Sequence, residues 1–148
     1  MSKQSTKSIS FALVAALAMC CVGCGGDMGR VTGTVTLDGK PLPEAIITFY
    51  PQGGEGGRAS AGMTDENGKY ELTFSRTEKG AKVGEHLVTI TTAVDAGDYS
   101  EGNEESINAE KVPTKYNAKS ELKKQVKSGN NEINFELDSE GEIVQSSY

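Results

Sequence analysis

Short segments in which apolar and polar residues alternate recur from residue 31 to residue 137, and this period of two restricts the chain to β structure. In the segment 31–37, Val31, Gly33, Val35 and Leu37 alternate with threonines. Alternation places one set of side chains on each face of a strand, so the pattern predicts half-buried strands. The other predicted strands are 45–50, 69–74, 86–92, 122–127 and 132–137.

Turn residues separate these segments and define the expected fold. Asp38-Gly39, the segment 65–68 and the segment 128–131 carry the Asp, Asn and Gly residues that tight turns prefer. The last of them predicts a hairpin between strands 122–127 and 132–137. The segment 45–50 is apolar on both faces, which predicts an inner strand. About seven short strands at this spacing predict an all-β fold, an antiparallel β-sandwich.

The segment 115–127 allows two interpretations. Leu122 and Val126 are four residues apart and could lie on one helical stripe. However, the segment follows Pro113 and leads into the turn at 128–131. This context favours a short turn or helical piece followed by a strand over 122–127, with a longer helix as the alternative.

The N-terminus has the pattern of an export signal. Lys3 and Lys7 precede 14 apolar or small residues, 9–22. A membrane-spanning helix needs about 17–25 such residues, whereas a secretory signal needs about 7–15 behind a basic start. We therefore expect a signal peptide over residues 1–23.

The three cysteines of the chain, Cys20, Cys21 and Cys24, lie at the end of this apolar segment. A zinc site needs about four ligands, and a redox Cys-x-x-Cys pair belongs within a folded domain. Neither condition is met, so a metal or redox role is disfavoured. The segment 21–24 resembles the lipobox of bacterial lipoproteins, with Cys21 in place of the usual leucine. That resemblance implies a fatty-acid anchor such as palmitate on Cys24; plain secretion and an uncleaved anchor are the alternatives.

Removal of the signal leaves 125 residues: a lipidated cysteine and tether over 24–29 and one domain over 30–148. This mature chain has 13 basic and 21 acidic side chains and a net charge of −8. Such a charge argues against nucleic acid as a partner and against electrostatic adhesion of the chain to anionic membranes. We expect an exported protein, anchored to the bacterial cell membrane or outer membrane and facing away from the cytoplasm.

Three motifs resemble the carboxypeptidase regulatory-like domains of the transthyretin-like (prealbumin-like) sandwiches. They are the V-x-G-x-V segment 31–35, the Gly-Lys-Pro-Leu-Pro segment 39–43, and the segment 64–70 with its Gly-Lys-Tyr ending. The resemblance extends over about residues 30–92. It implies the sandwich fold and a non-catalytic accessory or interaction role.

Candidate catalytic residues are few. The one histidine, His86, is expected to be an ordinary strand or surface residue. The related transthyretin-like hydrolases use several histidines and a Tyr-Arg-Gly-Ser tail, which this chain lacks. We therefore predict no enzyme activity, no catalytic residue, no cofactor and no metal site.

Two acidic segments are candidate cation sites. Asp65, Glu66 and Asn67 offer oxygen ligands but fit a turn better, because no glutamate follows at EF-hand spacing. The segment 95–110 carries six acidic residues and no basic one. We expect it to be a solvated surface loop, with a weak cation site or a partner contact as the alternative.

The expected function is that of a lipid-anchored, non-catalytic cell-envelope module with an interaction, accessory or structural role. Its partner would be another envelope protein or a glycan. A carbohydrate-binding module is the alternative, although the chain has no Trp and only Tyr99 and Tyr116 are expected to be exposed for stacking. A transthyretin-like hydrolase is a further, disfavoured alternative.

Overall fold

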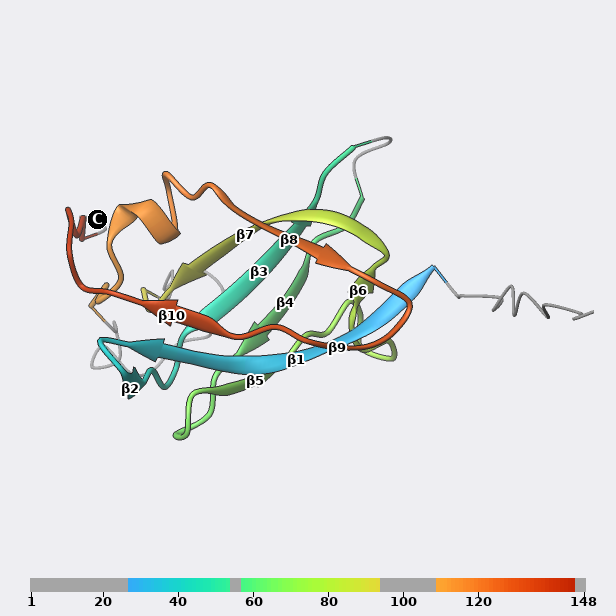
Figure 1. Ribbon diagram of the computed structural model, residues 1–148, viewed down its shortest axis with the longest axis horizontal. Helices are drawn as coiled ribbons and strands as arrows, with labels where there is room; N and C mark the ends of the chain where they lie inside the picture. Colours follow the sequence, from blue (N-terminus) through green and yellow to red (C-terminus); the bar gives the residue numbers. More distant parts are fainter. Residues whose placement is uncertain (1–26, 54–56, 94–108, 146–148) are drawn as a thin grey trace, which may run out of the picture.

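The computed structural model describes residues 27–53, 57–93 and 109–145, which form two β-sheets facing one another (Figure 1). The sequence therefore predicted the fold class correctly. Cys24, Tyr99 and most of the acidic segment 95–110 lie outside the described residues.

The first sheet is built around β1 (Met28–Leu37). On one side, β1 pairs antiparallel with β6 (Ala81–Lys82), β5 (Lys69–Glu71) and β2 (Lys40–Pro41). On the other side it pairs parallel with β9 (Gly129–Glu132) and β10 (Phe135–Leu137). These parallel pairs depart from the expectation of a purely antiparallel sandwich.

The second sheet is antiparallel throughout. Its strands lie in the order β4 (Ser60–Met63), β3 (Ile46–Pro51), β7 (Gly84–Thr91) and β8 (Leu122–Val126). The apolar strand β3 is an inner strand, as its sequence predicted. Gly84 begins β7 two residues before the predicted start of that strand at His86.

The core lies between the sheets and follows the predicted alternation. Val31 and Val35 of β1, Ile47 of β3 and Ile90 of β7 are fully buried. Each such side chain stabilises the fold by about 1.5–3 kcal/mol relative to exposure. Phe135 joins the sheets, because its ring centroid lies 6.3 Å from that of Phe49 and 6.2 Å from that of Tyr70.

The predicted hairpin between residues 122–127 and 132–137 is wrong. β8 pairs with β7 in the second sheet, whereas β9 and β10 pair with β1 in the first. Residues 127 and 128 carry the chain across, and the side chain of Asn131 holds this crossing by bonding to the backbone N–H and carbonyl of Lys127, at 2.9 and 2.7 Å. The turn residues at 128–131 thus join two sheets instead of two neighbouring strands.

The segment 115–127, for which the sequence allowed two interpretations, takes the conformation that its context favoured. The 3₁₀ turn η2 (Thr114–Tyr116) is followed by a further turn and then by β8. The hydroxyl of Ser120 donates to the carbonyl of Val88, which positions the start of β8 against β7. The longer helix is therefore excluded.

Gly33 allows β1 to approach the chain between β9 and β10. A Cβ at this position would lie 1.8 Å from the carbonyl oxygen of Ile133 and 2.9 Å from the Tyr70 ring. No side chain fits there without moving the backbone, which explains the glycine in the V-x-G-x-V segment.

Candidate functional site

The chain enters the sandwich close to the predicted lipidation site. β1 begins at Met28, four residues after Cys24 and two residues before the expected start of the domain. In the described part of the chain, no helix is long and apolar enough to cross a membrane. The described residues also contain no group of three or more His, Cys, Asp or Glu side chains that could hold a metal ion.

His86 is a buried residue of β7, with 1% of its surface exposed. Its Nε2 lies 2.8 Å from the carbonyl oxygen of Lys82, and its ring centroid lies 5.7 Å from that of Phe49. Its Nδ1 has no hydrogen-bond partner among the described residues. The imidazole is therefore a core group, and it makes no hydrogen bond to a carboxylate or a hydroxyl in the described structure.

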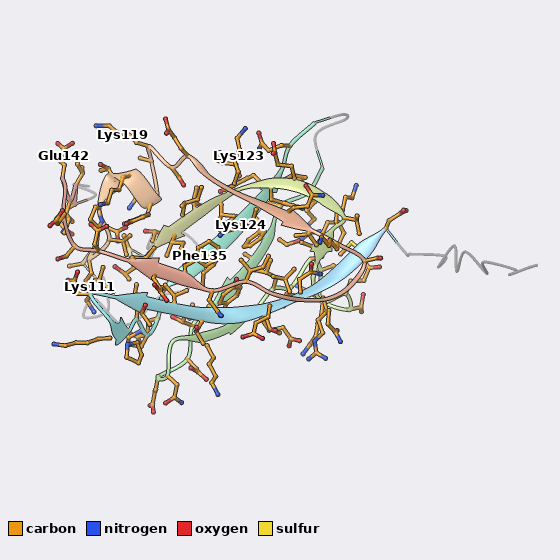
Figure 2. The ribbon with its side chains drawn as sticks, in the orientation of Figure 1. Lys111, Lys119, Lys123, Lys124, Phe135 and Glu142 are labelled. Carbon is orange, nitrogen blue, oxygen red and sulfur yellow. The ribbon has the colours of Figure 1, made fainter. Side chains whose placement is uncertain are left out.

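Lys124 of β8 lies opposite His86 in the sheet and extends toward the first sheet (Figure 2). Its ammonium group lies 5.4 Å from the centroid of the Phe135 ring. The aliphatic part of such a side chain covers apolar surface while the charged group stays near water. Lys124 thus covers the side of the sandwich between β8 and β10.

Two shallow depressions meet on the outer face of the first sheet. One of about 520 Å³ and one of about 300 Å³ both include Thr32 and Glu132 in their linings, so they form one groove along β1. We call it the β1 groove. Its other lining residues are Arg30, Gly33, Thr34, Lys69, Tyr70, Asn130 and Asn131.

Charged side chains border the β1 groove at its Arg30 end. Arg30 and Lys79 both pair with the carboxylate of Glu71, the arginine at 2.6 Å. The hydrogen bonds from Lys79 and Arg30 hold the pKa of Glu71 below its ordinary value. This end of the groove therefore presents two cations against one anion near neutral pH.

Tyr70 forms part of the floor of the groove. It is 4% exposed, and its hydroxyl donates to the carbonyl of Ile133 at 2.7 Å. Burial raises the pKa of this phenol well above its ordinary value. The ring belongs to the core, so it offers little surface for a sugar to stack on.

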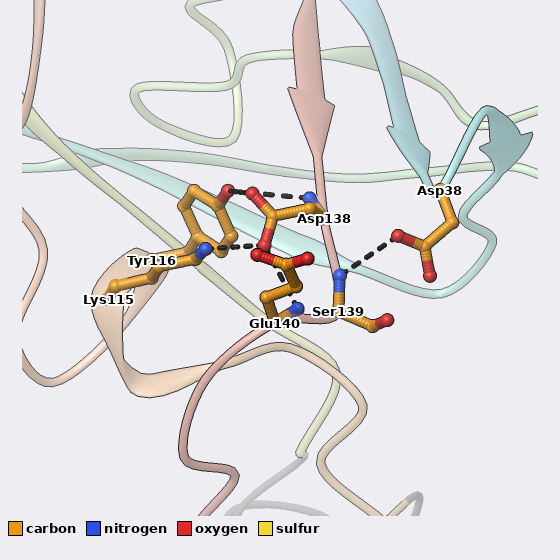
Figure 3. Close-up of polar contacts among 6 residues, drawn as sticks. All are labelled: Asp38, Lys115, Tyr116, Asp138, Ser139 and Glu140. Carbon is orange, nitrogen blue, oxygen red and sulfur yellow. Dashed lines mark hydrogen bonds and ion pairs between the residues drawn. The ribbon is translucent and has the colours of Figure 1, made fainter.

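Tyr116, which was expected to be exposed, belongs to a polar cluster near the C-terminal end of β1 (Figure 3). Its hydroxyl donates to Asp138 at 2.7 Å, and Lys115 forms an ion pair with the same carboxylate. The contact with Lys115, and to a smaller extent that with Tyr116, lowers the pKa of Asp138. The ring packs against the core, so that expectation is wrong; the exposed aromatic residue of the second sheet is Tyr50, at 44%.

Glu110 is the last residue of the acidic segment, and its carboxylate is buried at 7% exposure. Its Oε1 accepts hydrogen bonds from the N–H groups of Thr92, Lys111 and Val112 and from the Thr92 hydroxyl, at 2.9–3.0 Å, and Oε2 accepts from Thr91. Burial raises the pKa of Glu110, but the hydrogen bonds from Thr91, Thr92 and Val112 together outweigh it, so the pKa is lowered.

This contact joins Thr91 and Thr92, which precede the acidic segment, to its last residue. Gln145 reinforces it by exchanging two hydrogen bonds of 2.9 Å with the Glu110 backbone. Sequence reasoning missed Glu110 because it belongs to a segment rich in acidic and polar residues, which indicates a solvated loop. The sequence did contain one signal for this contact: the Thr91-Thr92 pair at the end of a predicted strand offers hydrogen-bond donors to a carboxylate.

Asp65 forms the turn that the sequence favoured over a calcium site. Its Oδ1 accepts hydrogen bonds from the N–H groups of Asn67 at 2.8 Å and Lys69 at 2.9 Å. These bonds close the turn before β5, which is the usual role of aspartate in such a segment. The carboxylate is therefore used by its own backbone.

No family model matches the sequence, and no curated protein matches it. A solved structure of a DUF3823 family protein from Parabacteroides merdae is similar to 74% of this chain, with 18% sequence identity and a TM-score of 0.39. The matched region spans 45% of the length of that protein.

Proposed function

We propose that this chain is an exported lipoprotein whose β-sandwich acts as a non-catalytic interaction module of the cell envelope. Cys24 would carry the lipid and hold the domain at the membrane, outside the cytoplasm. The domain would belong to the carboxypeptidase regulatory-like, transthyretin-like group. Its role would be to contact an envelope protein beside the membrane.

The observation that carries this proposal is the position at which the fold begins. The apolar segment 9–22 is followed by Cys24, and β1 begins at Met28. An anchor on Cys24 would leave only residues 25–27 between lipid and sandwich. This order of features is what a lipoprotein with one folded domain requires.

Contacts among the three motifs support the proposed family. The N–H of Val35 donates to the carbonyl of Gly68 at 2.8 Å, and the N–H of Leu42 donates to the carbonyl of Val35 at 3.0 Å. Thr64 donates its hydroxyl to the carbonyl of Leu42 at 2.6 Å. The residues that carry the resemblance thus hold one another in place within the fold.

A buried His86 supports a non-catalytic role. A histidine that acts as a general base must reach the proton it abstracts. This imidazole is 1% exposed and bonds to a backbone carbonyl.

The test is metabolic labelling with a fatty-acid analogue in cells that express the full chain. Wild type and the matched control Cys21→Ser should be labelled and found in the membrane fraction. Cys24→Ser should lose the label and remain unprocessed. Equal labelling of Cys24→Ser and wild type would contradict the proposal.

Carbohydrate binding is a second candidate, favoured by the β1 groove. Its hydroxyl, amide, carboxylate and guanidinium groups match the hydroxyls of a sugar chain. On a glycan array, the purified protein would then bind a sugar, and Glu132→Gln in the groove would weaken binding while Glu136→Gln on β10 would not. Equal binding by both variants, or no binding at all, would exclude the groove as a glycan site.

A further inference from the structure

The end of the sandwich at which β1 begins is formed by three segments that are far apart in the sequence. Met28 pairs with Lys82 of β6, and the N–H of Val83 donates to the carbonyl of Asp27 at 2.9 Å. Gly29 pairs with Gly129, the first residue of β9. The turn before β9 packs directly against β1, because a Cβ on Gly29 would lie 2.1 Å from the carbonyl oxygen of Lys127.

This end carries basic side chains although the chain as a whole is acidic. Lys82 and Lys127 are exposed and form no ion pair within the described residues. Arg58 is also exposed and unpaired there, and it follows Gly57, whose Cβ position lies 3.6 Å from the ammonium group of Lys82. Asp27 and Glu85 supply carboxylates at this end, and that of Glu85 is paired with Lys123 at 3.6 Å. We call Arg58, Lys82, Val83 and Lys127 the basic end.

Val83 adds an apolar contact to the basic end. It follows Lys82 directly, and 44% of its surface is exposed. A small apolar side chain among lysines and arginines suits the boundary between lipid headgroups and acyl chains.

Carboxylates gather at the opposite end of β1, which lies about 30 Å away for a strand of this length. They belong to the residues that follow β1, the turn before β5 and the chain around β10: Asp38, Asp65, Glu66, Glu136, Asp138 and Glu140. Figure 3 shows Asp38, Asp138 and Glu140 close together beside Ser139. We call these six residues the acidic end.

We propose that the basic end rests on an anionic lipid surface, so that the sandwich stands on the membrane with its acidic end directed away. This inference rests on the proposed lipid anchor. Three residues, 25–27, separate Cys24 from Met28, and the chain from residue 24 to residue 28 spans at most about 14 Å when fully extended. The anchor therefore holds the basic end within reach of the headgroups, where their negative charge attracts lysine and arginine and repels the acidic end.

The experiment uses protein purified from the membranes of expressing cells and returned to vesicles of phosphatidylcholine with or without phosphatidylglycerol. The mature chain is expected to have no free thiol, so one introduced cysteine can carry a fluorophore. Val83→Cys places it at the basic end, and Ser139→Cys is the matched control at the acidic end. With phosphatidylglycerol, a quencher on the lipid headgroups should quench Val83→Cys and leave Ser139→Cys bright.

Charge reversal tests the cause of this orientation. Lys82→Glu with Lys127→Glu should remove the quenching at Val83→Cys, since each cation changes association with an anionic surface about fivefold. Lys40→Glu with Lys119→Glu changes the net charge equally at the other end and should leave the quenching intact. High salt should weaken the quenching, because it screens exposed charges.

Three outcomes would overturn the inference. Equal quenching at Val83→Cys and Ser139→Cys would mean that the domain has no preferred orientation. Quenching that does not depend on phosphatidylglycerol would mean that charge does not set the orientation. Protein that fails to float with the vesicles would disprove the anchor itself and, with it, the inference.

Discussion

Asn134 lies beside Thr34, and its side-chain oxygen accepts hydrogen bonds from the Thr34 N–H at 2.8 Å and from the Thr34 hydroxyl at 3.0 Å. Asn134 is located between β9 and β10, at the place where neither strand pairs with β1. Its side chain therefore replaces a missing backbone hydrogen bond and lets the chain continue parallel to β1.

Asn134→Ala should lower the free energy of unfolding by roughly 1–2 kcal/mol, because the Thr34 N–H would lose its partner. Asn130→Ala is the control, since that exposed side chain makes no hydrogen bond within the described structure. Urea denaturation of both variants measures the difference. Equal stability of the two would show that solvent replaces the Asn134 contact fully.

Gly33→Ala should destabilise the sandwich by about 1–3 kcal/mol or more, because the added methyl group overlaps the Ile133 carbonyl. Thr32→Ala, one residue earlier on the outer face of β1, should cost less. Thermal unfolding followed by circular dichroism compares the two variants. A Gly33→Ala protein as stable as Thr32→Ala would contradict the close approach of β1 to residue 133.

Phe135→Ala should cost roughly 3–5 kcal/mol, because it removes a side chain that is 4% exposed and lies between Phe49 and Tyr70. Glu136→Ala, whose side chain is on the opposite face of β10, should have little effect. The free energies of unfolding of both variants give the comparison. Similar losses would mean that the register of β10 is wrong.

Glu110→Gln should destabilise the protein near neutral pH by about 1.5–3 kcal/mol, because the N–H groups of Thr92, Lys111 and Val112 would face a neutral amide. The pKa of Glu110 is lowered below its ordinary value of 4.5 on folding. The stability contributed by the carboxylate is therefore complete above that pH and is lost as the pH falls through the folded pKa.

The difference between wild type and Glu110→Gln should accordingly shrink below about pH 4.5, as the wild type loses this contribution. Denaturant titrations across the acidic range measure it. Glu121→Gln is the control, because that exposed side chain makes no hydrogen bond within the described residues. A difference that stays constant with pH would show that the charge of Glu110 contributes nothing.

Alternation was sufficient to predict β1, β5 and β10 and their buried faces. Val31, Val35, Tyr70 and Phe135 are buried as the period of two required, whereas β4, which shows no such alternation, was not predicted. This succeeded because the inward face of a sandwich strand is apolar whatever its neighbours are.

The pairing of the last strands could not be predicted in the same way. The alternation at 132–137 fits β8 as a neighbour as well as β1, and the choice depends on contacts distant in sequence. Among these are the bonds of Asn131 to Lys127 and of Asn134 to Thr34. Local turn residues predicted a hairpin, and tertiary packing gave a crossing between sheets.

The surface features depend on the same long-range pairings. Thr32 and Glu132 line the β1 groove together only because β1 and β9 are parallel in this register. Lys82 and Lys127 lie at the same end of the sandwich only because both adjoin the start of β1. The spacing of these residues in the sequence predicts neither the pairing of Thr32 with Glu132 nor the common location of Lys82 and Lys127.

Mass spectrometry of the N-terminal peptide, from protein isolated with the membranes of expressing cells, tests the central claim most directly. We predict a peptide that begins at Cys24 and carries lipid on that cysteine. A mature chain that begins at any other residue, or at Cys24 without lipid, would contradict the account of a sandwich anchored at the membrane through residue 24.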